Sequence, residues 1–157
     1  MNKLRLTVSA VIPRYEDRKL KDNQYLFVEN VESGLWSLPS GKIEYRETPK
    51  SALQRECIEE IGVIIEIKGL IGIYQFISLH RNWVTDFAYL GRLLSEPKII
   101  RPGEIAQIKW FNLEKIYDLR KERMLRSGKA QTTPIEDLIY SEGKILPLNL
   151  VKKSRGR

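Results

Sequence analysis

The stretch from residue 41 to residue 63, GKIEYRETPKSALQRECIEEIGV, constrains the fold more than any other part of the chain. Thr48 suits the position that caps a helix, and Pro49 suits the first helical position, where a missing N–H costs nothing. Gly62 can take the left-handed conformation in which many helices end. The pattern therefore predicts a helix over residues 49–61.

Three glutamates of this helix should share one face. At about 100° per residue, Glu56, Glu59 and Glu60 fall within roughly one 100° arc. Like charges one turn apart repel each other, and a bound cation would relieve that repulsion. Carboxylate oxygens suit hard ions, so we expect these side chains to bind Mg²⁺ or Mn²⁺. The neighbouring stripe is apolar and should face the core: Leu53, Cys57 and Ile61.

The same stretch resembles the Nudix box of the Nudix hydrolase superfamily, whose members cleave nucleoside diphosphates linked to another group. A random window meets all seven fixed positions about once in 10⁸–10⁹. The resemblance implies an α/β fold, a mixed sheet in an α/β/α sandwich, and metal-dependent hydrolysis. The seven positions are Gly41, Glu47, Arg55, Glu56, Glu59, Glu60 and Gly62.

The resemblance also implies roles for single residues. Arg55 would pair with Glu47 and fix the loop ahead of the helix. Water must be activated to attack phosphorus, and Glu59 or Glu60 can take its proton. An acidic residue in the loop before a late strand often reaches the metal in this family, and Glu104 occupies such a loop.

Substrate contacts are expected at three positions outside the carboxylate set. Gly41 lets the backbone turn tightly between a strand and the loop. Arg81 can contact phosphate, and Trp83 can stack on a base. His80, the only histidine, is typical of a surface residue in a hairpin turn.

The remaining pattern predicts one domain over residues 1–150, built from a mixed sheet with helices on both faces. Hydrophobic periodicity indicates strands over 4–13, 24–29, 36–38, 64–78, 83–94 and 105–111. Gly69 and Gly72 indicate a bend or bulge within the fourth of these strands. Further helices are expected over 113–119 and 134–142, the second opening on a capping box of Thr133 and Glu136.

Charge and composition bear on partners and location. The net charge of +7 favours polyanionic partners, and four of the last seven residues are basic, which predicts a disordered tail over 151–157. No apolar run is long enough for a membrane span, and the N-terminus reads as a strand rather than a signal peptide. A single cysteine, Cys57, is compatible with the reducing cytoplasm.

Together these features predict a hydrolase that cleaves a phosphoanhydride bond of a nucleoside di- or triphosphate or a related small pyrophosphate. The order of elements after residue 105 is weakly similar to the NudJ-type phosphatase branch. Three alternatives stay open: an RNA 5′-end pyrophosphohydrolase, an ADP-ribose or dinucleotide pyrophosphohydrolase, and a nucleotide-binding module without turnover. Family members often dimerise, so a homodimer is also open.

Overall fold

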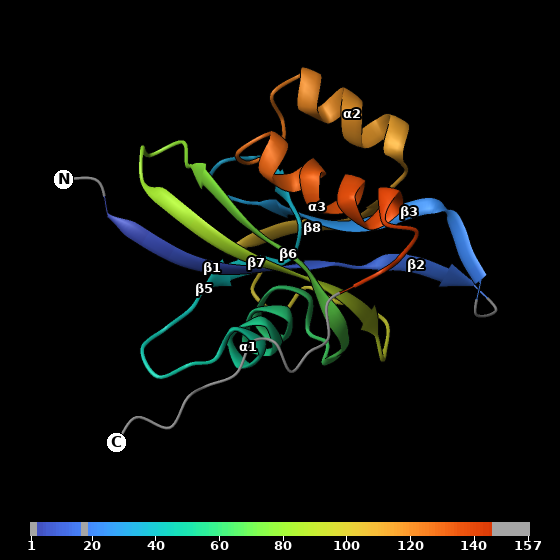
Figure 1. The fold of residues 1–157 in the computed structure, drawn as a ribbon, viewed down its shortest axis with the longest axis horizontal. Helices are drawn as coiled ribbons and strands as arrows, with labels where there is room; N and C mark the ends of the chain where they lie inside the picture. The colour runs from blue at the N-terminus through green and yellow to red at the C-terminus, as the bar shows by residue number, and fades with distance from the viewer. Residues whose placement is uncertain (1–2, 17–18, 146–157) are drawn as a thin grey trace.

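The computed structural model describes residues 3–16 and 19–145 (Figure 1). The basic tail predicted over residues 151–157 lies outside this range. None of the helices within the described ranges is long and apolar enough to cross a membrane.

Two sheets form the centre of the molecule. The first has the strand order β5-β1-β7-β6, in which β1 and β7 run parallel and the other pairs antiparallel. The second joins β2, β3 and β4, with β8 paired to β3. The strands are β1 Leu4–Val11, β2 Pro13–Glu16, β3 Lys19–Asn30, β4 Trp36–Ser37, β5 Ser40–Lys42, β6 Ile65–Ile77, β7 Trp83–Leu93 and β8 Ile105–Phe111.

Helices cover both sides of these strands, as Figure 1 shows. Helix α1 (Pro49–Ile61) lies on one side, and α2 (Leu113–Lys121) and α3 (Lys129–Tyr140) lie on the other. Each side has its own apolar cluster, and both sheets contribute to both clusters. The α/β/α layers predicted from the sequence are therefore confirmed, with the strands divided between two sheets rather than one.

The apolar stripe of α1 packs into the apolar cluster on its own side of the strands. Leu53, Cys57 and Ile61 are fully buried against Val8 and Tyr89 of the first sheet. This burial leaves the neighbouring stripe of the helix, which carries the glutamates, at the edge of the core. The sequence therefore placed both faces of α1 correctly.

Several element bounds differ from the prediction. The first predicted strand divides into β1 and β2, and the short strand β5 was missed. The long hairpin of β6 and β7 is present, and its register shifts at Gly69 and Gly72 confirm the predicted bulges. A turn closes this hairpin, with the Ser78 N–H donating to the Asn82 carbonyl at 2.9 Å.

The start of the last helix was predicted wrongly. Helix α3 begins at Lys129, so Pro134 lies inside it and the expected capping box does not open it. Tertiary contacts hold the extra first turn, because Gln131 is buried and its Oε1 accepts a 2.8 Å hydrogen bond from the Leu38 N–H. Local cap signals could not reveal this contact, which joins residues 93 positions apart.

Candidate active site on helix α1

The ends of α1 are set by the residues that the sequence indicated. Thr48 is the N-cap: its Oγ1 accepts from the Ser51 N–H at 3.2 Å, and the Thr48 N–H donates to the Ser51 Oγ at 2.9 Å. Gly62 ends the helix with φ 66° and ψ 20°, in the left-handed region. These two ends fix the register of the helix and hence the direction of its glutamates.

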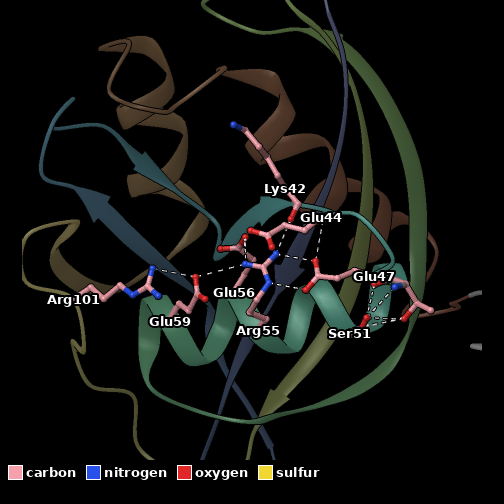
Figure 2. A network of polar contacts seen from close by, with 9 residues as sticks. Lys42, Glu44, Glu47, Ser51, Arg55, Glu56, Glu59 and Arg101 are labelled. Carbon is pink, nitrogen blue, oxygen red and sulfur yellow. Dashed lines mark hydrogen bonds and ion pairs between the residues drawn. The ribbon is translucent and has the colours of Figure 1, made fainter.

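Arg55 fastens the loop before α1 to the helix itself (Figure 2). Its Nε and Nη2 donate to the two oxygens of Glu47 at 2.7 and 2.9 Å. Nη2 also donates to the Lys42 carbonyl at 2.8 Å, and Nη1 donates to Glu56 Oε1 at 2.7 Å. The hydrogen bonds from Arg55 lower the pKa of Glu47, so this carboxylate stays ionised. The pair implied by the resemblance is thus present.

Gly41 is needed for space rather than for an unusual backbone angle. A Cβ built at this position would overlap the carboxyl carbon and both oxygens of Glu56, each closer than 3.0 Å. Gly41 is not among the residues with positive φ. The tight turn expected at Gly41 is therefore not the reason for a glycine here. The glycine instead lets the Glu56 carboxyl lie directly against the backbone of β5.

Glu60 is a strongly perturbed acid of the site. Burial raises its pKa to about 8, against the hydrogen bond that its Oε2 accepts from the Ser40 N–H at 2.9 Å. The donor is a backbone group, so this contact does not depend on the Ser40 side chain. Arg126 and Glu104 lie close enough to lower and raise the pKa of Glu60 respectively.

Glu59 and Glu104 are joined through an arginine that the sequence analysis did not single out. Nη1 of Arg101 lies 3.1 Å from Glu59 Oε2 and 3.5 Å from Glu104 Oε1 (Figure 2 shows the first contact). Nη1 of Arg55 approaches the same Glu59 oxygen at 3.5 Å. Glu104 thus lies near the glutamates of α1, and its role at a metal stays a prediction.

The donor set fits a hard divalent cation. Glu56, Glu59 and Glu60 supply carboxylate oxygens from one face of one helix, and hard divalent ions prefer such ligands. Within residues 3–16 and 19–145, no three acidic, His or Cys side chains are already gathered around one point. Arg55 and Arg101 occupy oxygens of Glu56 and Glu59, so these contacts would have to yield to an ion.

A cavity of about 120 Å³ opens beside the carboxylates, on the face of the first sheet that lies under the start of α3. Ser40, Gly41 and Lys42 of β5 form the side nearest the glutamates. Arg5, Lys42 and Arg126 supply its cationic side chains. The cavity belongs to the same site because Arg126 also acts on Glu60.

The sequence-based substrate contacts are only partly in this cavity. Gly41 lines it, whereas Arg81 and Trp83 do not. Arg81 lies in the exposed β6–β7 turn, and Trp83 begins β7 with half of its surface exposed. The turn lies at one end of the cavity, since Ser78 is in its lining. Their assignment as substrate contacts therefore stays a prediction that the cavity does not support.

Two lining residues were missed by the sequence analysis. Arg126 carries no local signal, because it reaches the site from the segment between α2 and α3. Asp86 does carry one: it is a charged residue within the apolar strand sequence WVTDFAYL, and it is buried. Charged residues are almost never buried without a partner, so this position could have been marked.

Comparison with known proteins agrees with the geometry. A NUDIX domain family model matches residues 3–134. A NUDIX hydrolase structure from Nitrosomonas europaea is 29% identical, with a TM-score of 0.80, and the match covers 97% of this chain and 98% of that one. An RNA pyrophosphohydrolase of Pseudomonas fluorescens is 31% identical over 69% of this chain and 63% of its own length.

A MutT-like protein of Streptomyces ambofaciens is 36% identical over 45% of this chain. The matched part spans 42% of that relative, less than half of its length. The matches nevertheless agree with one another and with the arrangement of Arg55, Gly41 and the three glutamates. The chain belongs to the NUDIX domain family, and its site has the make-up of a Nudix hydrolase.

Proposed function

We propose that the protein is a Mg²⁺-dependent pyrophosphohydrolase that cleaves a phosphoanhydride bond of a nucleoside di- or triphosphate. One observation carries the proposal. Arg55 braces the loop against α1, and the Glu56 carboxyl of α1 lies so close to Gly41 of β5 that a Cβ at residue 41 would overlap it. Such bracing places charged groups before the substrate arrives, which is how sites stabilise developing charge.

The residues of the site have distinct roles in the proposed reaction. Glu56, Glu59 and Glu60 would hold Mg²⁺ or Mn²⁺, which when bound neutralises phosphate charge and makes a water molecule more acidic. Glu59, Glu60 and Glu104 are the carboxylates that can accept the proton of the attacking water. Arg55 and Glu47 would keep the loop and α1 in place through their ion pair.

The cavity supports a small phosphorylated substrate. Lys42 and Arg126 place positive charge at the end nearest the glutamates, where phosphate groups would lie. A volume of about 120 Å³ is below the roughly 300–1,000 Å³ of sites that enclose a drug-sized ligand. We therefore expect the cavity to take one part of the substrate while the phosphates extend over the carboxylates.

The proposal is tested with Glu60→Gln, which keeps the shape of the side chain and its contact with the Ser40 N–H. We expect turnover to fall by at least about 100-fold, the usual contribution of a positioned acid or base. Glu114→Gln, an exposed change in α2, is the matched control and should leave turnover unchanged. Unchanged turnover in Glu60→Gln would remove the central assignment.

RNA with a 5′ triphosphate is the second candidate substrate. It is favoured by the RNA pyrophosphohydrolase relative and by the net charge of +7. Binding to RNA should weaken steeply with salt and weaken further on deletion of residues 151–157. A salt-independent affinity, or an affinity that the deletion leaves unchanged, would count against this substrate.

Self-association and a cytoplasmic location are further proposals. Leu4, Trp83 and Ile77 are cross-strand neighbours on β1, β7 and β6, and each is more than half exposed. Apolar side chains grouped in this way often mark an interface between proteins. Light scattering that gives the monomer mass at every concentration would exclude a homodimer. The proposed cytoplasmic location is supported by Cys57, a buried cysteine whose thiol is free.

A further inference from the structure

A buried carboxylate lies on the floor of the cavity beside the glutamates. Asp86 is 6% exposed, and its two oxygens each accept a hydrogen bond of 2.6 Å, one from Thr7 Oγ1 and one from Ser9 Oγ. Both hydroxyls come from β1, and all three side chains line the cavity. The two donors fix the plane of the carboxylate, so its remaining lone pairs have defined directions.

The position of Asp86 relative to the carboxylate site follows from the strand register. Asp86 on β7 pairs with Thr7 on β1, which pairs with Lys42 on β5. Two inter-strand spacings, about 10 Å, therefore separate Asp86 from Lys42. A ligand whose phosphates lie by Lys42 and Gly41 can thus place its other end against Asp86, along one face of the sheet.

The walls of the cavity suit a flat ring. Phe76 lies on the same face of the sheet, one strand beyond β7, and Ala130 and Gln131 of α3 close the opposite side. Gln131 is held in place by its hydrogen bond from the Leu38 N–H. A base in this space would have apolar surface on its faces and a carboxylate at its edge.

The chemistry of the carboxylate discriminates between the bases. Burial raises the pKa of Asp86, and the hydrogen bonds from Ser9 and Thr7 oppose this shift. In its ionised form the carboxylate only accepts hydrogen bonds, and its two oxygens match two adjacent donors. Guanine presents such a pair, N1–H and N2–H₂, on its Watson–Crick edge. Adenine and cytosine present one donor beside an acceptor, and uracil and thymine present one donor between two acceptors. An acceptor facing the ionised Asp86 would set its partial negative charge and lone pair against the carboxylate, with no proton between them, which is costly in a buried site.

We propose that this cavity is the base subsite and that Asp86 selects guanine nucleotides. The inference rests on the proposed function, because it assigns the substrate class of the same site. The C8 position of guanine is on the far side of the ring from the edge that Asp86 reads. Asp86 therefore does not separate guanine from its C8-oxidised form.

The test separates base selection from turnover by measuring nucleotide binding in EDTA, which prevents metal-dependent turnover. Affinities of GDP, ADP, CDP and UDP are measured by calorimetry in EDTA, for the wild type and for Asp86→Asn. We expect GDP to bind wild type about 10- to 100-fold more tightly than the others, the usual discrimination of a two-point base contact. Asp86→Asn offers one donor and one acceptor, so this preference should disappear.

Asp137→Asn is the matched control. Asp137 is exposed on α3 and accepts from Tyr74 outside the cavity, so this variant should keep the GDP preference. Equal affinity of the wild type for all four nucleotides, or no binding at all, would overturn the proposal even if the enzyme hydrolyses other substrates. A GDP preference that survives in folded Asp86→Asn would overturn it too.

Turnover distinguishes this inference from the proposed function. Hydrolysis of all four nucleoside triphosphates at equal kcat/KM would keep the pyrophosphohydrolase and refute the guanine subsite. GDP selection without turnover of any substrate would keep the subsite and refute the hydrolase. If Asp86→Asn does not fold, the wild-type affinities alone test the assignment, because a wild type without a GDP preference refutes it.

Discussion

Replacing Gly41 with alanine should lower activity while leaving the stability of the fold nearly unchanged. The new Cβ would lie closer than 3.0 Å to three carboxyl atoms of Glu56, whereas ordinary contact begins at 3.4 Å. The carboxyl group therefore has to move, by a distance on the order of 1 Å. A displacement of this size in a catalytic group can cost about 100-fold in rate.

The fold should tolerate the same change. The atoms that the methyl group meets belong to the end of a flexible side chain rather than to backbone. Gly41 does not have a positive φ, so alanine brings no backbone strain. We expect the free energy of unfolding to change by less than about 1 kcal/mol, because loss of flexibility in the unfolded chain offsets part of any cost.

The assay pairs urea unfolding with the Mg²⁺ dependence of turnover. Gly41→Ala should show a lower kcat and a higher Mg²⁺ requirement at nearly unchanged stability. Gly103→Ala is the matched control, because its Cβ would meet no atom within 4 Å and its φ is not positive. Wild-type kcat and Mg²⁺ requirement in Gly41→Ala would refute the close approach of Glu56 as the reason for glycine.

Three further predictions concern Arg55, Glu60 and Cys57. Arg55→Lys keeps the charge but not the two-point contact with Glu47. Urea unfolding should therefore show a free energy of unfolding lower by about 1–2 kcal/mol. An equal decrease in the exposed control Lys68→Ala would contradict this. Burial raises the pKa of Glu60 to about 8 from an ordinary 4.5. Between these values the folded state holds more protons than the unfolded state, so stability in EDTA falls as pH rises. Unfolding curves of Glu60→Gln should show a shallower fall, since the raised pKa values of Glu56 and Asp86 remain; an unchanged fall in the variant would exclude Glu60 as a source. Burial also raises the pKa of the Cys57 thiol, so a thiol reagent should label it only after unfolding, and rapid labelling of the folded protein would show that Cys57 is accessible.

The parts of the fold that depend on local chemistry were predictable. The bounds of α1 follow from Thr48, Pro49 and Gly62, each of which acts within one turn of the helix end. The long strands follow from alternation and burial, although their ends shift by a few residues. The start of α3 was not predictable, because the contact between Gln131 and Leu38 depends on the assembled fold.

In the candidate site, too, some features were predictable from the sequence and others were not. The carboxylates of α1 share a face because of helix geometry alone, so their sequence spacing was enough. The role of Gly41 was misjudged, since the approach of Glu56 to β5 is a tertiary contact. Arg101 and Arg126 come from other segments, and only the folded chain brings them to the glutamates, whereas Asp86 lies in the adjoining cavity.

The most direct test of the central claim is phosphate release by the wild type, measured with Mg²⁺ and then with EDTA. The panel contains nucleoside di- and triphosphates, ADP-ribose, dinucleoside polyphosphates and 5′-triphosphate RNA. We predict turnover of nucleoside di- or triphosphates that Mg²⁺ supports and EDTA abolishes. Turnover that EDTA leaves unchanged, or a folded protein that hydrolyses none of the panel, would contradict a metal-dependent pyrophosphohydrolase built on Glu56, Glu59 and Glu60.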